Sequence, residues 1–428
     1  MNVRLLQERG KSKLNIVNRY EKLRRDTRVL FHIKNSSKYL MTNEVNEDPG
    51  RLRVISADKN GKIDMEGYML GSIFAHMPDI IPDLEKMSCS FGELNPDYFD
   101  RNPVVDGLIG LAVGDAFGVP VEFLSRQEVQ KINLQDMVGA DSSLSFTSGW
   151  SEMIPKGSWS DDTSMTIATM ASIIDNLGQI DYDDIMYRFI RWWGIGEYSS
   201  LSFPFGLGNT VSKAMERYRN GTPALQCGGT GIRDNGNGAL MRMYPISIWC
   251  ILKDYNDEDT QGFIQKAAAL THGHQINAMS CFMYTLFLRE CIRTRNPRRA
   301  YDLVFNNFNL EKRYRCFFSE ETVQAHEILL KNNFKTTFDS NTIPESGYVV
   351  DSLAIMVYSI LNTDNYEDAV KMAVSFGYDT DTNAAITGSV AGAIYGVDHI
   401  PERWLNVLKK KEELIQIGQT FSKYICIE

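Results

Sequence analysis

The chain has 428 residues, of which 43% are hydrophobic and 23% charged, a composition ordinary for a soluble globular protein. It contains no run of about 18 uncharged apolar residues, so we expect no membrane span, and its first residues lack the apolar core of a signal peptide. Seven cysteines, odd in number and without CxxC spacing, indicate reduced thiols in the cytoplasm and argue against disulfides or a thiolate zinc site.

The first residues are basic although the whole chain is acidic. Residues 1–34 contain ten Lys or Arg and three Asp or Glu, a net charge of +7, whereas the whole chain carries −9. Such a segment is either a solvated helix face or a surface that contacts an acidic protein. We expect no nucleic acid partner, because the acidic remainder would repel it and the segment lacks a recognised binding motif.

A change in composition near Asn102-Pro103 predicts two parts, an N-terminal extension over residues 1–102 and a larger domain over residues 103–428. The larger part shows helical apolar spacing and few alternating β-branched runs, which predicts a large all-α domain. Its clearest helices are expected over residues 165–177, 263–270, 278–292 and 366–374. Small residues over 384–396 would let another helix pack closely.

The N-terminal extension is predicted to be a small mixed α/β unit that binds a partner. Leu14, Val17 and Tyr20 recur at helical spacing, and residues 29–33 read as a short strand. Residues 52–65 contain Asn60-Gly61 between extended runs, which predicts a hairpin with a type I′ turn.

Two acidic clusters, Ser160-Asp161-Asp162-Thr163 and Asp379-Thr380-Asp381-Thr382, each lie where a loop enters a predicted helix. Their carboxylate and hydroxyl oxygens suit hard divalent cations such as Mg²⁺ or Mn²⁺. Together the carboxylates would carry a charge of about −4, which two divalent cations would neutralise. Without metal, two carboxylates roughly 4 Å apart would repel by about 4 kcal/mol.

Each cluster also has an interpretation as a helix cap. Ser160 before a helical run is an ordinary N-cap residue, and Asp161 and Asp162 would suit the positive end of the helix dipole. Asp379 could do the same for a helix that begins near Asn383. Taken together, two oxygen-rich corners with glycine nearby favour a metal site.

Five sequence blocks occur in a recognisable order. They are GLIGLAVGDAFG at 107–118 leading to Glu122-Phe123, GSWSDDTSM at 157–165, GNGALMRMYPI at 236–246, THGH at 271–274 and FGYDTDTNAAITG at 376–388. A sixth, weaker block, SGYVVDSL, covers residues 346–353. In this order the blocks resemble the ADP-ribosylglycohydrolases, the enzymes related to the dinitrogenase reductase-activating glycohydrolase. The match spans about residues 104–400.

The resemblance implies an all-α domain with a binuclear magnesium or manganese centre at the floor of a cleft. The ligands that it implies are Ser160, Asp161, Asp162, Asp379, Asp381 and Thr382. Glu122 matches a family carboxylate near the metals, so we assign it acid–base work. The substrate-binding positions that it implies are Asn237, Gly238, Met241, His272, Tyr348 and Tyr378. Asp115 reads as a structural residue that caps or orients its neighbours, and Arg242 as either a phosphate contact or an internal salt bridge.

The activity implied is hydrolysis of the bond between C1″ of ADP-ribose and an acceptor on a modified protein, often an arginine side chain. Cleavage at this anomeric carbon develops oxocarbenium character, which bound metal and acid–base groups relieve. A different class of function is an immunity protein whose extension binds and blocks a cognate ADP-ribosyltransferase toxin, and both activities could coexist. A third interpretation keeps the metal centre and makes free ADP-ribosyl compounds the substrate.

Three positions depart from the family pattern. Ser160 stands where the family usually has Thr, and its hydroxyl oxygen preserves the ligand. Tyr378 replaces the second Gly before the DTD triplet, so its ring would narrow the cleft or stack on substrate. Residues 203–208 lack the acidic residue that some arginine-specific relatives carry there.

Overall fold

The computed structural model describes residues 101–140, 153–306, 312–331 and 339–425, together with the backbone of three strands between residues 29 and 57. The chain forms two compact units, residues 1–72 and residues 73–428. The larger unit is helical throughout its described part, which confirms the predicted fold class. The division at residue 102 stays a prediction.

The smaller unit contains a three-stranded antiparallel sheet. Its strands are β1 (Val29–Lys34), β2 (Ser37–Thr42) and β3 (Arg53–Ala57), paired in the order β1-β2-β3. Strand β1 confirms the strand predicted over 29–33, whereas β2 was not predicted. The helical spacing over 14–20 and the turn at Asn60-Gly61 lie outside the described residues.

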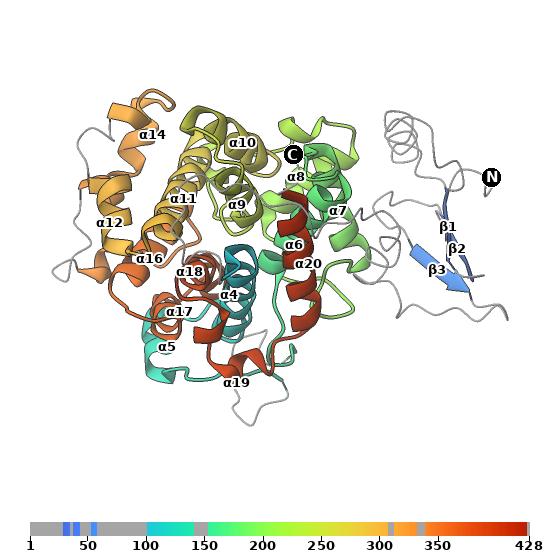
Figure 1. Cartoon of the computed structure of the whole chain (residues 1–428), viewed down its shortest axis with the longest axis horizontal. Helices are drawn as coiled ribbons and strands as arrows, with labels where there is room; N and C mark the ends of the chain where they lie inside the picture. Colours follow the sequence, from blue (N-terminus) through green and yellow to red (C-terminus); the bar gives the residue numbers. More distant parts are fainter. Residues whose placement is uncertain are drawn as a thin grey trace. The chain divides into compact units, whose positions relative to one another are not determined.

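The larger unit is an assembly of α-helices joined by loops and short 3₁₀ turns (Figure 1). The helices that carry or support the site are α4 (Pro103–Gly118), α6 (Asp161–Asp175), α7 (Tyr182–Ile195), α11 (Gln275–Thr294), α16 (Val349–Leu361), α17 (Tyr366–Val374) and α18 (Thr380–Tyr395). Around them lie α5 (Arg126–Ile132), α8 (Asn209–Arg219), α9 (Tyr244–Leu252), α10 (Asp257–Ala269), α12 (Pro297–Tyr301), α14 (Glu320–Ala325), α15 (Glu327–Lys331), α19 (Glu402–Leu405) and α20 (Lys411–Ile425).

The four helices predicted from apolar spacing are present as α6, α10, α11 and α17. Helix α17 has the predicted bounds, and the other three begin three to six residues earlier than expected. The difference has one cause: their first turns carry polar residues that apolar spacing cannot detect. For the same reason α18 begins at Thr380, before the expected start near Asn383.

Helix α4 is the centre of the larger unit. The side chain of Asn102 caps it by accepting hydrogen bonds from the backbone nitrogens of Val104 and Val105, and Pro103 occupies its first turn. All of its residues are buried. Among the described helices, the segment Pro103–Val121 alone has the length and mean hydropathy, 1.6, of a membrane span, and 94% of that window is buried inside the domain. Its apolar residues therefore face protein on every side.

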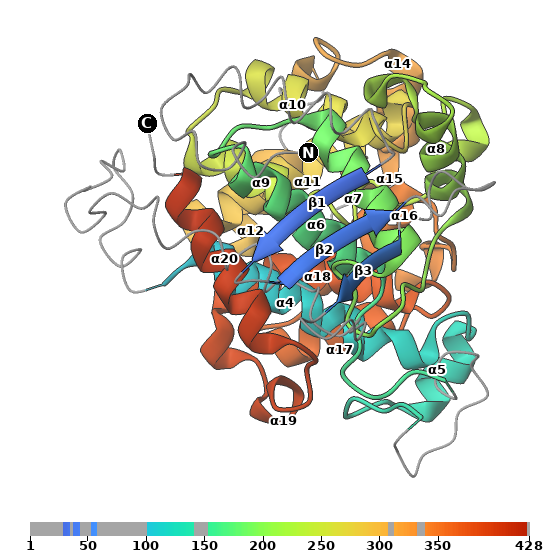
Figure 2. The same ribbon diagram turned by 90° about the vertical axis from the view of Figure 1, so that its right-hand side faces the viewer.

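Helices α4 and α18 pack against each other at backbone contact. A Cβ atom on Gly110 would lie 2.2 Å from the carbonyl oxygen of Gly388, and one on Gly114 would lie 2.1 Å from that of Ala384. These glycines are required because any side chain would push the helices apart. Figures 1 and 2 show the two helices side by side within the helical unit. The close packing predicted for the small residues over 384–396 is confirmed.

Candidate active site

The N-termini of α6 and α18 bring the two acidic clusters together. One carboxylate oxygen each from Asp115, Asp162 and Asp381 lie within 4.8 Å of one another, and the same holds for Glu122, Asp379 and Asp381. Asp381 belongs to both groups, so it joins them into one cluster. Residues separated by more than two hundred positions therefore share a single buried site.

The side-chain caps expected from Ser160 and Asp379 are absent, although Asp161 and Asp162 do lie in the first turn of α6. Ser160 and Asp379 occupy the N-cap positions of α6 and α18, but neither side chain makes a capping hydrogen bond. Instead, the Ser160 hydroxyl donates to Oδ2 of Asp162 at 3.0 Å, and the Thr382 hydroxyl contacts the same oxygen at 3.4 Å. The hydroxyls of both loops thus converge on one carboxylate.

Asp115, which projects from α4, supplies the cap that Ser160 does not. Its Oδ1 accepts a hydrogen bond from the Ser160 backbone nitrogen at 2.9 Å. Its Oδ2 accepts from the backbone nitrogen and the hydroxyl of Thr163, at 3.0 and 2.7 Å. The structural role expected for Asp115 is confirmed, and it fixes the start of α6 directly beside the cluster. The sequence signal for this role was the block GDAFG, in which Asp115 is the only acidic residue.

A glycine loop covers Asp161. A Cβ atom on Gly206, whose φ is +90°, would lie 2.4 Å from Oδ1 of Asp161. Only glycine therefore fits at this position, for steric as well as conformational reasons. The loop over 203–208, which lacks an acidic residue, borders the cluster at this point.

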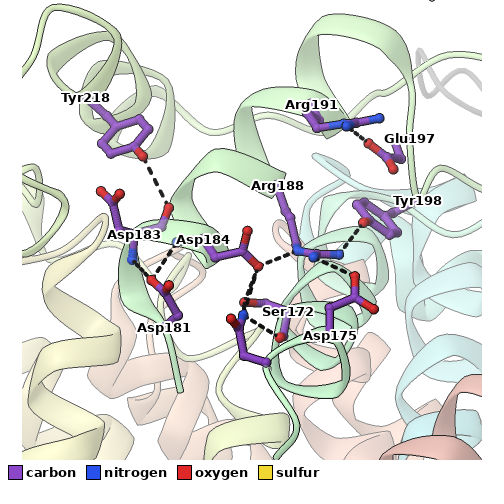
Figure 3. A network of polar contacts seen from close by, with 11 residues as sticks. Ser172, Asp175, Asp181, Asp183, Asp184, Arg188, Arg191, Glu197, Tyr198 and Tyr218 are labelled. Carbon is purple, nitrogen blue, oxygen red and sulfur yellow. Dashed lines mark hydrogen bonds and ion pairs between the residues drawn. The ribbon is translucent and has the colours of Figure 1, made fainter. Parts of the chain in front are cut away.

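A polar network at the far end of α6 anchors the segment that leads into this loop (Figure 3). The buried Arg188 guanidinium donates to Oδ2 of Asp184 and of Asp175, both at 2.7 Å, and to the Tyr198 hydroxyl at 2.9 Å. Two residues further on, the Ser200 hydroxyl donates to the carbonyl oxygen of Trp159 at 2.6 Å, next to Ser160. The network therefore holds the segment after α7 at the far end of α6, and the Ser200 hydrogen bond ties the same segment to the start of α6. Sequence reasoning missed both.

Asn237 contacts the second cluster. Its Nδ2 donates to Oδ2 of Asp379 at 2.8 Å and to the hydroxyl of Ser352 on α16 at 2.9 Å. The backbone also pairs here, because the Asn237 nitrogen donates to the carbonyl oxygen of Gly347 at 3.0 Å. The weak block over 346–353, which contains Tyr348, is thereby placed against the cluster. A Cβ atom on Gly347 would lie 3.0 Å from Oδ2 of Asp379.

His272 lies against the glycine-rich loop. A Cβ atom on Gly238 would lie 3.0 Å from its Cε1. Its Nδ1 lies 2.9 Å from the Thr271 hydroxyl, which accepts from the Arg242 guanidinium at 2.7 Å. Burial, followed by the Arg242 charge, lowers the pKa of His272 to about 3, so the ring is neutral.

Two other residues of this region lie inside the protein. Arg242 is 1% exposed and donates to the carbonyl oxygen of Ala267 as well as to Thr271. It therefore lies inside the domain, and no salt bridge joins it to a carboxylate of the described residues. Met241 is also buried, at 3% exposure, so its side chain belongs to the core beneath the loop.

Burial makes the carboxylate cluster electrostatically costly. It raises the pKa of Asp161, Asp162 and Asp381 well above the usual range, and neighbouring carboxylates raise it further. Burial also raises the pKa of Asp115 to about 6, although its hydrogen bonds oppose the change. The positive ends of α6 and α18 point at the cluster, but a helix dipole contributes only about 0.3–1 kcal/mol. In its fully ionised form the cluster would therefore need compensating positive charge.

The residues present fit divalent metal ions. Every donor in the cluster is a carboxylate or hydroxyl oxygen, the set that Mg²⁺ and Mn²⁺ prefer. Oδ1 of Asp162 is buried and has no hydrogen-bond partner among the described residues. A buried carboxylate oxygen without a partner is rare and costly, and a bound cation would satisfy it.

The all-α fold and the carboxylate cluster together define a helical hydrolase domain, and comparisons with known proteins agree. The ADP-ribosylglycohydrolase family model matches residues 94–425. ADP-ribosylarginine hydrolase Tri1 of Serratia proteamaculans is 32% identical over 76% of this chain and 80% of its own length. ADP-ribosyl-[dinitrogen reductase] glycohydrolase of Rhodospirillum rubrum is 28% identical, over 74% of this chain and 93% of its own.

A solved structure supports the same assignment. An ADP-ribosylglycohydrolase-related protein complex superposes with a TM-score of 0.59 and 26% identity, covering 75% of this chain and 96% of that chain. The chain belongs to the ADP-ribosylglycohydrolase family. It is an enzyme that hydrolyses the N-glycosidic bond through which ADP-ribose is attached to modified proteins.

Proposed function

We propose that this enzyme is a metal-dependent hydrolase that removes ADP-ribose from arginine side chains. One observation carries the metal dependence: carboxylates from α6 and α18 meet in one buried cluster while Asp115 performs the capping in place of Ser160. The arginine acceptor is supported by the similarity to ADP-ribosylarginine hydrolase Tri1, at 32% identity.

The metal ligands in this proposal come from both helix starts. They are Ser160, Asp161 and Asp162 at α6 and Asp379, Asp381 and Thr382 at α18. Two divalent cations, Mg²⁺ or Mn²⁺, would balance the cluster's charge. Bound there, they would orient the ribose hydroxyls and stabilise negative charge as Lewis acids.

The chain's own residues provide binding and proton transfer. Glu122 is 8% exposed and lies in one carboxylate group with Asp379 and Asp381. We assign it the acid–base role. Asn237, Gly238 and His272 provide the ADP-ribose contacts, and the neutral imidazole lies against the glycine loop with its Nε2 edge. Tyr348 pairs with Gly236 of the same loop, Tyr378 directly precedes Asp379, and the buried Met241 supports the loop from below.

Substitution of the ligands tests this function. We expect Asp161→Ala and Asp381→Ala to abolish release of ADP-ribose while the helical circular dichroism persists. Excess chelator should have the same effect on the wild-type enzyme. Full activity in these variants or in chelator would end the metal proposal. Release from arginine-linked ADP-ribose, compared with serine-linked ADP-ribose and free ADP-ribosides, identifies the acceptor.

A second candidate function concerns the N-terminal extension. The net charge of +7 over residues 1–34, in a chain of net charge −9, favours contact with an acidic protein surface. We infer that the extension binds an ADP-ribosyltransferase toxin and blocks it, alongside hydrolysis. Deletion of residues 1–100, which keeps the Asn102 cap of α4, should abolish tight binding of such a transferase and leave hydrolysis intact. Undiminished binding by the truncated protein would show that the extension is not the inhibitory element.

A further inference from the structure

Two aromatic residues beside the carboxylate cluster have a left-handed backbone. Phe123 has a φ of 66° and Tyr378 a φ of 60°. Bulky side chains avoid this region because Cβ collides with the backbone, and glycine normally occupies it. Phe123 follows Glu122 in the chain and Tyr378 precedes Asp379, so both unfavourable conformations occur directly next to carboxylates of the cluster. Backbone strain of this kind persists where the surrounding structure enforces it.

The surrounding structure does enforce it. The Phe123 nitrogen donates to the carbonyl oxygen of Tyr378 at 2.6 Å, and the Tyr378 nitrogen donates to that of Leu124 at 2.7 Å. The buried Arg126 guanidinium lies 4.7 Å from the centre of the Phe376 ring and donates to the Phe376 carbonyl oxygen at 3.3 Å. The loops over 122–124 and 376–379 are therefore tied to each other and to the domain, which holds both rings in place.

The two rings are exposed although they are apolar. Phe123 is 63% and Tyr378 43% exposed, and their ring centres lie 6.2 Å apart in an edge-to-face arrangement with an interplanar angle of 79°. Neither ring contributes to the core, so core packing does not explain why aromatic residues occupy these left-handed positions. The rings instead present an aromatic surface at the edge of the cluster.

We propose that Phe123 and Tyr378 form the subsite for the guanidinium group through which ADP-ribose is attached to the protein substrate. This inference rests on the proposed arginine specificity. The guanidinium is planar and cationic, so it is attracted to the faces of aromatic rings. The carboxylate of Glu122, which lies outside the proposed set of metal ligands, directly precedes Phe123 in the chain. Adenine is also planar, but it lies at the other end of ADP-ribose from C1″, whereas the guanidinium is bonded to C1″ itself. Because the rings stand beside the residues proposed to act on that bond, the guanidinium is favoured as the occupant.

The test replaces Tyr378 with residues that distinguish the effect of its ring from the effect of its backbone conformation. Tyr378→Gly removes the ring and relieves the left-handed strain, so the protein should fold with an unchanged or higher melting temperature. The KM for a peptide with arginine-linked ADP-ribose should rise by about three- to thirtyfold, the range for loss of a cation–π contact. Tyr378→Phe keeps the ring and should retain the wild-type KM. Inhibition by free ADP-ribose, which lacks the guanidinium, should be unchanged in both variants.

Leu177 provides a matched control. It has a φ of 56°, is 47% exposed and lies just beyond the C-terminal end of α6, at the opposite end of that helix from Asp161. Leu177→Gly relieves the same kind of strain and removes a similarly exposed apolar side chain away from the cluster. Its melting temperature should behave as that of Tyr378→Gly, whereas its KM should equal that of the wild-type enzyme.

Three results would overturn the subsite. Equal weakening of substrate and free ADP-ribose by Tyr378→Gly would assign the rings to adenine. An unchanged KM in Tyr378→Gly would show that the ring makes no substrate contact. An equal rise in KM in Leu177→Gly would show that the effect comes indirectly from altered stability. Failure of the proposed function differs from all three: the wild-type enzyme would then release no ADP-ribose from arginine, and the guanidinium subsite would fall with it.

Discussion

The side-chain nitrogen of Asn237 donates a hydrogen bond of 2.8 Å to Oδ2 of Asp379 across 142 positions of the sequence. The same nitrogen donates to the Ser352 hydroxyl at 2.9 Å, so helix α16 braces Asn237 from behind. If Asp379 is a metal ligand, as proposed above, an amide that holds its carboxylate in this way would fix the orientation of the ligand.

Asn237→Ala should therefore lower the affinity for Mn²⁺ by about 10- to 100-fold, the usual cost of losing a residue that orients a ligand. Calorimetric titration of the metal-free protein with Mn²⁺, after the chelator has been removed, measures the change in affinity. Ser352→Ala is the control, because it leaves the contact between Asn237 and Asp379 in place and should have a smaller effect. Equal affinities of Asn237→Ala and the wild-type protein would refute the role of this contact.

Asp162→Asn should have opposite effects on stability with and without metal. In chelator, the amide removes one charge from a group of buried carboxylates that raise one another's pKa, so the melting temperature should rise above that of the wild-type protein. With Mn²⁺ present, the wild-type protein should gain much more, because the variant has lost a ligand. Thermal unfolding in both conditions gives the comparison. A melting temperature lowered by the substitution in chelator would contradict mutual repulsion within the cluster.

Gly110→Ala should destabilise the domain by about 2 kcal/mol or more, since its Cβ would lie 2.2 Å from the carbonyl oxygen of Gly388 and backbone cannot give way cheaply. Gly262→Ala is the matched control: this glycine lies inside α10, and a Cβ atom added there would have nothing within 4 Å. There alanine should stabilise by about 0.5–1 kcal/mol through helix propensity. Denaturant unfolding followed by circular dichroism measures both. Similar effects of the two substitutions would mean that the α4–α18 contact is looser than described.

The burial of His326 should make the folded protein less stable in mild acid. It is buried, its Nδ1 donates to the carbonyl oxygen of Thr322 at 2.8 Å, and its Nε2 accepts from the Ser280 hydroxyl at 2.8 Å. Burial lowers its pKa from 6.5 to about 4. In the unfolded chain His326 therefore binds a proton below pH 6.5, whereas in the folded protein it does so only below about pH 4. The histidine's stabilising contribution is complete above pH 6.5 and is lost as the pH falls toward 4, by about 3 kcal/mol in all.

The measurement for His326 is the free energy of unfolding at several pH values between 7.5 and 4, compared between the wild-type protein and His326→Gln. Glutamine does not titrate, so the variant should show a shallower pH dependence. A remaining slope of the same sign is expected from His272, whose pKa is also lowered. Identical slopes in the two proteins would show that His326 titrates normally in the folded state.

Much of the fold and of the site followed from the sequence because motif order and apolar spacing are local signals. The two acidic clusters were recognised by their oxygen donors, and the structure brings them together. Spacing alone could not show that Asp115 replaces Ser160 as the cap of α6, because that exchange depends on a contact between α4 and α6. The expected contact of Asn237 with substrate stays a prediction, and its hydrogen bond to Asp379 was not expected.

Other features depend on geometry that no single position reveals. Tyr378 was recognised as a departure from the family pattern, but its pairing with Phe123 follows from backbone hydrogen bonds between two loops. Gly206 gave no signal of its own, since a glycine in a loop is common, and its contact with Asp161 arises only when the chain is folded. Strand β2 was missed because Ser37–Thr42 shows no clear alternation of polar and apolar residues.

The contact of α4 with α18 through Gly110 and Gly388 also limits how this enzyme can change. Because the two main chains are in contact, neither helix has room to slide or to turn about its axis. The distance between the carboxylates that the two helices carry, such as Asp115 and Asp381, is therefore set by this helix contact. New leaving groups would then be accommodated in the surrounding loops, where residues such as Phe123 and Tyr378 stand. Laboratory evolution toward another acceptor should accumulate its substitutions there and leave the helix pair untouched.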